Sequence, residues 1–259
     1  MPSDRKFDRF LPFKIMKLIT ALIASGFLSL SSAFCQQPVN PQISDAELAS
    51  ARKLVLSTVF GGSNELVRRW TSVPLAATLG ASNEEQTMFL DVISEINDVL
   101  QNSPMKVSAA PTSTKISSGK IPDVGAAIRI YFCKASQMPS LCQLQHITYT
   151  NRVMNEWEFW NEDHSLKSVI AMIPRDRYTP DQLRCVTMRT MYFALGFRGF
   201  SDGSFPTAFS KNWPSKFQPL DRQTIRFFYS YVSPGMNYDQ VRNEINVHWG
   251  DVASMFPVR

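Results

Sequence analysis

The sequence predicts an α+β fold with one mixed β-sheet and flanking helices. Three observations lead to this prediction. Apolar residues recur at helical spacing in some segments and alternate with polar residues in others. The order of these segments is strand, helix, several strands, and then helix, loop and helices, which is typical of an α+β domain. The composition, 44% hydrophobic and 19% charged, is that of a chain that buries an ordinary core.

A basic and then apolar segment begins the chain. Five Lys or Arg residues lie among the first 17, residues 18–30 are mostly apolar, and small residues lead up to Ala33. This is the pattern of a secretory signal peptide, and the apolar run is short for a membrane anchor, which needs about 20 residues. We expect residues 1–33 to be a leader, with Met16 as a second possible start. Residues 34–259 would then be one secreted or periplasmic domain without a stable membrane span.

The charge of the chain does not indicate a nucleic-acid partner. The full chain has 27 basic and 22 acidic residues, and the leader holds five and two of them. The mature chain would therefore carry a net charge of only about +2, without a basic stripe interleaved with aromatic residues.

Capping boxes, glycines and prolines place the elements of the first half. Ser44 opens a helix that continues to about Phe60. Residues 73–79 read as a strand, and Asn83 caps an amphipathic helix. Residues 103–122 are rich in Ser, Thr, Pro and Lys, which favours a long surface loop.

The second half is predicted to hold the remaining strands and the last helices. Strands are expected at residues 126–133, 146–150, 153–160 and 166–173, with a hairpin through residues 151–152. Helices are expected at residues 179–196, 221–231 and 237–247, with a turn at residues 234–235 between the last two.

The helix at residues 179–196 is well capped but carries no catalytic group. Thr179 is a good N-cap, Gln182 completes a capping box, and Gly196 suits the left-handed conformation that ends a helix. Most of its other side chains are apolar. We expect this helix, including Phe193, to fill the core beneath the sheet.

Cysteine usage fits an oxidising compartment. Cys133, Cys142 and Cys185 lie in the predicted mature chain, and Cys35 lies at its edge. Export predicts at least one disulfide among the first three. Cys133–Cys142 would close a short loop, whereas Cys142–Cys185, which we favour, would tie the sheet to the helix; the sequence leaves both open. Without a Cys-x-x-Cys motif or a Cys/His cluster, no metal or cofactor is expected.

Acidic and aromatic residues alternate in one predicted strand. Glu156, Glu158 and Trp160 would share one face, and Trp157 and Phe159 the other. A functional interpretation is a carbohydrate or peptide site in which carboxylates act beside aromatic platforms. The structural interpretation, which we favour from the sequence, puts the glutamates in water and the aromatic residues in the core.

Three further segments follow a shared pattern. They are Leu66-Val67-Arg68-Arg69-Trp70, then Ala194-Leu195-Gly196-Phe197, and then Pro219-Leu220-Asp221-Arg222 through Tyr229 to Pro234-Gly235-Met236. Together they resemble a bacterial family of secreted or lipoprotein domains of unknown function, which look zincin-like and have an "ALGL" helix end, an "LD" helix start and a "PGM" turn. The resemblance implies a zincin-like topology.

The resemblance also aligns the well-capped helix with the zinc-binding helix of zincins. With Gly196 on the glycine of HExxHxxG, the two His ligands correspond to Arg189 and Phe193, and the general-base Glu corresponds to Thr190. A guanidinium group stays protonated and a phenyl ring has no donor atom, so this register provides no zinc site. We expect Arg189 either to pair with a carboxylate such as Asp221 or Glu158 or, as we favour, to reach the surface.

Two functions remain. The first is a non-catalytic exported domain that binds a protein or a cell-envelope component. The second is an exported hydrolase with a site near Glu156 and Glu158. The missing HExxH favours the first.

Overall fold

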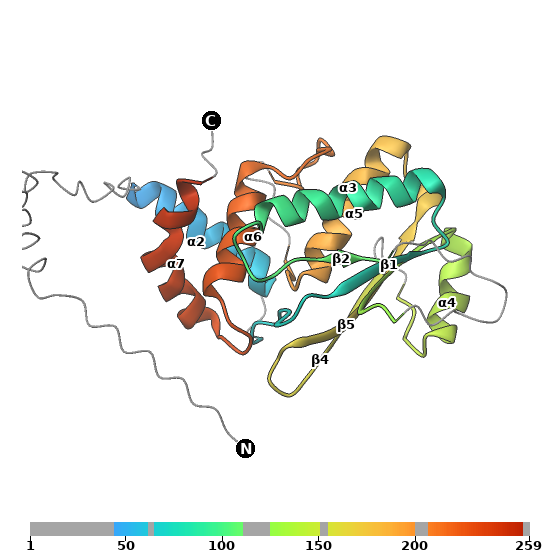
Figure 1. Cartoon of the computed structure of the whole chain (residues 1–259), viewed down its shortest axis with the longest axis horizontal. Helices are drawn as coiled ribbons and strands as arrows, with labels where there is room; N and C mark the ends of the chain where they lie inside the picture. The colour runs from blue at the N-terminus through green and yellow to red at the C-terminus, as the bar shows by residue number, and fades with distance from the viewer. Residues whose placement is uncertain (1–43, 62–64, 111–124, 151–154, 200–206, 256–259) are drawn as a thin grey trace, which may run out of the picture. The chain divides into compact units, whose positions relative to one another are not determined.

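The fold is given by a computed structural model (Figure 1). Its described residues are 44–61, 65–110, 125–150, 155–199 and 207–255. They belong to one compact unit, Asn40–Arg259. The predicted leader, Cys35 and the predicted hairpin turn at residues 151–152 lie outside the described residues. None of the described helices is both long and apolar enough to cross a membrane.

Five strands form a single mixed sheet in the described part of the chain. They stand in the order β2-β1-β3-β5-β4. The pairs β2–β1, β1–β3 and β3–β5 are parallel, whereas β4 pairs antiparallel to β5 at one edge of the sheet. The strands are β1 (Leu75–Leu79), β2 (Ser108–Ala109), β3 (Ile128–Cys133), β4 (Asn155–Trp160) and β5 (Leu166–Pro174).

Six α-helices accompany this sheet among the described residues, so the predicted class of one mixed sheet with flanking helices is confirmed. They are α2 (Asp45–Phe60), α3 (Asn83–Val99), α4 (Met138–Leu144), α5 (Pro180–Ala194), α6 (Pro219–Tyr231) and α7 (Tyr238–Ala253). Short 3₁₀ turns, η1 (Ala135–Gln137) and η2 (Arg175–Arg177), precede α4 and α5. Helices α2, α6 and α7 pack together at one end of the molecule (Figure 1).

Alternation along the strands separates two hydrophobic layers. Ile128 and Ile130 of β3 belong to the larger layer, which also holds residues of α3 and α5. Tyr131 and Cys133 point the other way, into a smaller layer beneath α4. Figure 1 shows α4 on the side of the sheet opposite α3 and α5.

Helix α5 packs across the larger layer and begins and ends as predicted. The Thr179 hydroxyl accepts from the Gln182 N–H at 3.3 Å, and the Gln182 side chain accepts from the Thr179 N–H at 3.0 Å. Gly196 adopts a φ of 101°, the left-handed conformation expected after the helix. Tyr192 is buried, whereas Phe193 is only half-buried and packs against the edge of the larger layer, so the predicted full burial of Phe193 is not found.

Two predictions in the first half differ in detail from the structure. Ser82, rather than Asn83, caps α3, because the Ser82 hydroxyl accepts from the Glu85 N–H and the Glu85 carboxylate accepts from the Ser82 N–H. The loop predicted at residues 103–122 supplies β2, which extends the sheet beside β1. A strand of two residues is too short to leave an alternating pattern in the sequence.

The strand predicted at residues 146–150 is not formed. The chain just before it forms α4, whose Met138, Leu141 and Cys142 recur at helical spacing and are buried in the smaller layer. Strand β4 pairs instead with β5, through a polar turn in which His164 has a φ of 63°. The apolar residues before β4 therefore pack over the sheet and do not extend it.

The three described cysteines are buried free thiols, so the predicted disulfide is absent from the structure. The sheet prevents the favoured Cys142–Cys185 pairing. Cys142 lies in the layer beneath α4, whereas Cys185 lies on α5 and donates to the carbonyl of Ala208 at 3.4 Å. Burial raises the pKa of Cys133 to about 12, which disfavours its reactive thiolate form.

The three segments behind the family resemblance meet at one junction. The Trp70 indole N–H donates to the carbonyl of Ala194, and the Tyr229 hydroxyl donates to that of Leu195, each at 2.7 Å. The segment before β1 also exchanges two backbone hydrogen bonds of 2.9 Å with the Pro-Gly-Met turn. These motif residues thus fasten the end of α5 to its neighbours.

Candidate binding pocket beside β4

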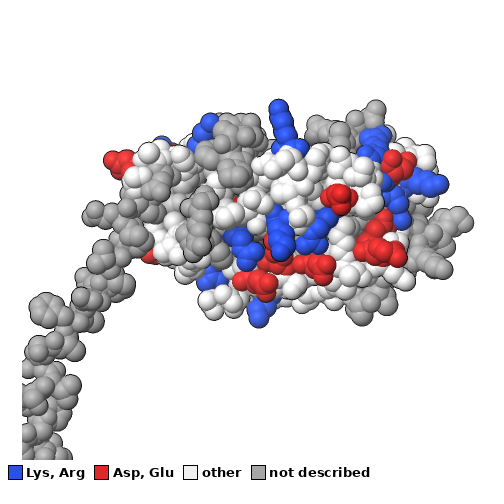
Figure 2. Space-filling view, turned by 90° about the horizontal axis from the view of Figure 1, so that it is seen from above, with Lys and Arg blue, Asp and Glu red and all other residues white. Residues whose placement is uncertain are grey.

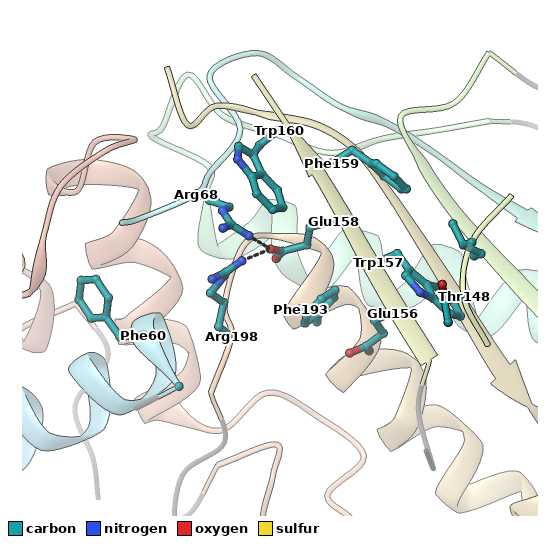
Figure 3. Close-up of a pocket in the computed structure, with 12 residues that line it drawn as sticks. Phe60, Arg68, Thr148, Glu156, Trp157, Glu158, Phe159, Trp160, Phe193 and Arg198 are labelled. Atoms are coloured by element: carbon teal, nitrogen blue, oxygen red, sulfur yellow. Dashed lines mark hydrogen bonds and ion pairs between the residues drawn. The ribbon is translucent and has the colours of Figure 1, made fainter. Parts of the chain in front are cut away.

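A pocket of about 530 Å³ lies where β4, the end of α5 and the segment before β1 come together (Figure 3). A volume of this size is typical of small-ligand sites. Its lining combines charged and aromatic side chains. The lining residues are Phe60, Gly61, Arg68, Ile147, Thr148, Glu156, Trp157, Glu158, Phe159, Trp160, Phe193 and Arg198.

The two glutamates of β4 face the pocket and α5. Glu156 stands opposite Ala171 of β5 and Glu158 opposite Val169, and both partners belong to the larger hydrophobic layer. Directly opposed residues share a face of the sheet. The Glu158 side chain is accordingly only 4% exposed. The structural interpretation favoured from the sequence, with both glutamates in water, is therefore wrong, because α5 and its neighbours cover this face of the edge strand.

The aromatic residues of β4 are distributed differently from that interpretation. Trp157 packs against the smaller layer, whereas Phe159 and Trp160 are 38% and 44% exposed at the pocket. A β-bulge between Phe159 and Trp160 shifts the register of the strand there. The Arg68 guanidinium lies 3.1 Å from the centroid of the Trp160 ring, a cation–π contact. All four residues of the predicted binding cluster, which excludes Phe159, line this pocket.

Two arginines converge on a single oxygen of Glu158. Its Oε2 atom lies 2.9 Å from Arg198 Nη2 and 3.6 Å from Arg68 Nη1 (Figure 3). Both arginines also bond to Glu65. Burial raises the pKa of Glu158 to about 7, although the charge of Arg68 opposes the shift. The network joins β4 to the chain before β1 and to the chain after α5.

Backbone contacts hold both arginines in place. The carbonyl of Arg69 accepts from the Leu166 N–H at 2.9 Å, which ties the segment carrying Arg68 to the start of β5. The N–H of Arg198 donates to the carbonyl of Thr58 at 2.8 Å, near the end of α2. Backbone hydrogen bonds thus fix the positions of the segments that carry the two arginines of the pocket.

Glu156 has a different environment from Glu158, although both belong to β4. Burial and the nearby charge of Glu158 raise the pKa of Glu156 well above its ordinary value, which favours the protonated form of this carboxyl. Its Oε1 atom is buried without a hydrogen-bond partner among the described residues. The Oε1 atom of Glu158 is likewise buried without a hydrogen-bond partner among the described residues.

The positions aligned with the zincin ligands have other roles in this chain. Arg189 donates to the carbonyls of Ala208 at 2.7 Å and Ser210 at 3.0 Å, a pairing that differs from both predicted alternatives. Thr190 is buried, and Phe193 lines the pocket. Gly196 packs so closely on the chain before β1 that an added Cβ would lie 2.2 Å from a carbonyl oxygen there.

The charged groups elsewhere in the described part of the chain do not form a metal site. Among the described residues, no three His, Cys, Asp or Glu side chains converge in a way that could hold a metal ion. His248 stacks on Tyr231 and lies 3.5 Å from the carboxylates of Glu244 and Asp251. On the face shown in Figure 2, acidic and basic side chains are intermixed.

Sequence reasoning did not identify the arginines of the pocket. Arg68 belongs to one of the segments that carry the resemblance, and Arg198 follows Gly196 by two residues. The sequence did contain one signal: each arginine lies in or just after a segment that carries the resemblance. If these two segments contact each other, their arginines lie close together. The partner in β4, Glu158, is far from both in sequence.

Comparisons of the chain with protein-family models, with curated proteins and with solved structures find no match.

Proposed function

We propose that this chain is an exported, non-catalytic binding domain with a degenerate zincin-like fold, and that it holds an extended polypeptide segment of a protein or envelope partner along β4. The order of strands and helices that suggested zincins in the sequence supports the fold. The basic and apolar leader supports export. At the three aligned ligand and base positions, Arg189, Thr190 and Phe193 offer no zinc ligand.

One observation carries the binding proposal. Strand β4 ends the sheet, and among the described residues it pairs with β5 alone. The outermost strand of a sheet presents backbone donors and acceptors along its outer side, to which an extended peptide can add. The pocket and the exposed rings of Phe159 and Trp160 lie on the same strand. Main-chain pairing would supply affinity, and the pocket would supply specificity.

Peptide probes test strand addition directly. We would select hexapeptides from a random library on the full-length protein and then N-methylate alternate residues of each selected peptide. In a paired strand only every second residue turns its N–H toward the partner edge. One methylated set should lose binding at least tenfold, while the other set keeps it. Equal tolerance of both sets would contradict strand addition.

A matched pair of variants locates the binding site. Trp160→Ala should weaken peptide binding about tenfold, because large aromatic residues carry much of the energy of an interface. Leu144→Ala is the control, since Leu144 is an exposed apolar residue on α4, across the sheet. If both variants bind as the wild type does, the peptide does not use β4.

A second function, an exported hydrolase, is favoured by one specific observation. The two carboxyls of the pocket have different environments: Glu158 is paired to two arginines, whereas Glu156 is buried with its pKa raised and has an oxygen without a partner among the described residues. Such divergence is typical of acid–base pairs. Turnover of a peptide or polysaccharide that is lost in Glu156→Gln and kept in Glu162→Gln, an exposed site on the same hairpin, would favour this function.

A further inference from the structure

The carboxyl oxygens of the pocket outnumber the donors that reach them. Arg68 and Arg198 both bond to Glu158 Oε2, which leaves Glu158 Oε1 and Glu156 Oε1 buried without donors among the described residues. Buried polar atoms are rarely left without partners in native proteins, and each exception calls for an explanation. Both atoms belong to side chains that face one pocket.

We propose that the pocket receives a basic side chain, Lys or Arg, of the bound polypeptide, whose cation pairs with Glu156 and the free oxygen of Glu158. This inference rests on the proposed function and adds the specificity of the same site. At the glutamates the ligand must supply a donor, because the unpartnered oxygens there are acceptors. The Nε atoms of Arg68 and Arg198 are also buried without partners among the described residues, but both guanidinium groups are already paired with Glu158. An acidic ligand would instead add a third carboxylate beside Glu156 and Glu158.

Charge balance favours a cation over a neutral donor. Arg68 and Arg198 are offset by Glu65 and Glu158, which leaves Glu156 without a cation of its own. Burying an unpaired carboxylate is costly, so burial raises the pKa of Glu156 and favours its protonated form while the pocket is empty. An ammonium or guanidinium group at Glu156 would allow it to ionise and form a charge-assisted hydrogen bond.

The walls of the pocket suit the stem of such a side chain. Trp160 and Phe193 present aromatic surface near the glutamates, and Phe60 lies on the far side of the two arginines (Figure 3). Lys and Arg bury their methylene stems along apolar surface while the charged head reaches a polar group. Aromatic faces also attract the cation itself.

The two glutamates also restrict what can pair with β4. Inward-pointing charges are one means by which proteins keep an edge strand from pairing indiscriminately. A strand that places an apolar residue beside Glu156 would bury the Glu156 carboxyl without a partner. A strand that places a Lys or Arg residue at the same position would give this carboxyl a hydrogen-bond donor. The edge is therefore open to one chemical class of partner.

Small probes test the inference without a known partner. The probes are N-acetyl-lysine methylamide, its norleucine analogue of nearly equal shape without the charge, and spermidine. We would titrate each into the full-length protein and follow the Trp160 indole N–H by NMR. The lysine probe should shift this signal and bind at least tenfold tighter than the norleucine probe. Spermidine binding tighter than the lysine probe would overturn the assignment to a polypeptide side chain.

Variants then assign the cation site. Glu156→Gln should reduce the preference for lysine over norleucine at least fivefold, and Glu162→Gln, an exposed control, should keep it. Calorimetry of the wild type in two buffers should show proton release on binding, because Glu156 must ionise. Equal binding of the two probes, or an unchanged preference in Glu156→Gln, would overturn the inference. If selected hexapeptides still show the alternating N-methyl effect, the proposed function stands and only its specificity fails.

Discussion

Two buried carboxyl sites in this molecule share a pKa direction but differ in every contact. Asp221 at the start of α6 accepts from the Ala208 N–H at 2.7 Å and from the Gln218 N–H at 2.9 Å, and it is 1% exposed. Glu156 beside the pocket has a buried oxygen without a partner among the described residues. Burial raises both pKa values, for Asp221 to about 7. A shifted pKa alone therefore does not separate a structural carboxyl from a binding carboxyl; the donors around it do.

Adjacent residues of α5 should show the largest contrast between the two regions. Tyr192 faces the Asp221 region, where it is buried and stacks on Phe197 at 4.2 Å, whereas Phe193 lines the pocket. Tyr192→Ala should destabilise the fold by about 3–5 kcal/mol, the usual cost of a large cavity, and Phe193→Ala by only about 1–2 kcal/mol. Urea unfolding of both variants measures the difference. Equal costs would mean that the pocket is as tightly packed as the core.

The pH dependence of stability should identify Asp221 as a buried acid. Its pKa is about 7 in the fold against 3.8 ordinarily, so between about pH 4 and 7 the unfolded chain releases a proton that the fold retains. The contribution of Asp221 to the free energy of unfolding is fully present below about pH 4. It decreases as the pH rises toward 7, by up to about 4 kcal/mol in total. Asp221→Asn should show a shallower decline in urea unfolding at pH 4.5, 6 and 7.5. Parallel curves for variant and wild type would contradict the assignment.

The smallest expected effect is a gain in stability at the pocket. Glu156→Leu removes a buried carboxyl that has an unsatisfied oxygen, and it should stabilise the fold by about 1 kcal/mol at pH 7. The same variant should lose the preference for a basic ligand. Residues kept for binding often cost stability in this way. A loss of more than 1 kcal/mol in thermal or urea unfolding would show that Glu156 is structural, as Asp221 is.

The elements with strong local signals could be predicted from the sequence. The capping box of Thr179 and Gln182 and the glycine at position 196 are local, so α5 was placed within a residue or two at each end. Helix α4 was missed because three buried apolar residues within seven are too few to distinguish a helix from a loop, and β2 because two residues cannot show an alternation. Which face of β4 is covered depends on α5, which lies later in the chain, so alternation alone gave the wrong environment for the glutamates.

The candidate site was predictable only in part. Its acidic and aromatic residues are contiguous in β4 and were found as a cluster. Arg68 and Arg198 come from segments about 90 and 40 residues away from Glu158, and the sheet register and the glycine junction bring them together. The favoured Cys142–Cys185 pairing failed for a related reason, because the spacing of cysteines does not reveal that a sheet separates these two residues.

The glycines at the junction have a consequence for how this domain can diverge. A Cβ on Gly199 would lie 1.7 Å from the carbonyl oxygen of Ser57, and one on Gly196 would lie 2.2 Å from that of Arg68. Main chain thus lies directly on main chain around the charged end of the pocket, and side-chain packing does not set the spacing there. Descendants of this sequence could replace Glu156, Phe193 or Trp160, and so change ligand, while the frame that holds them keeps its dimensions.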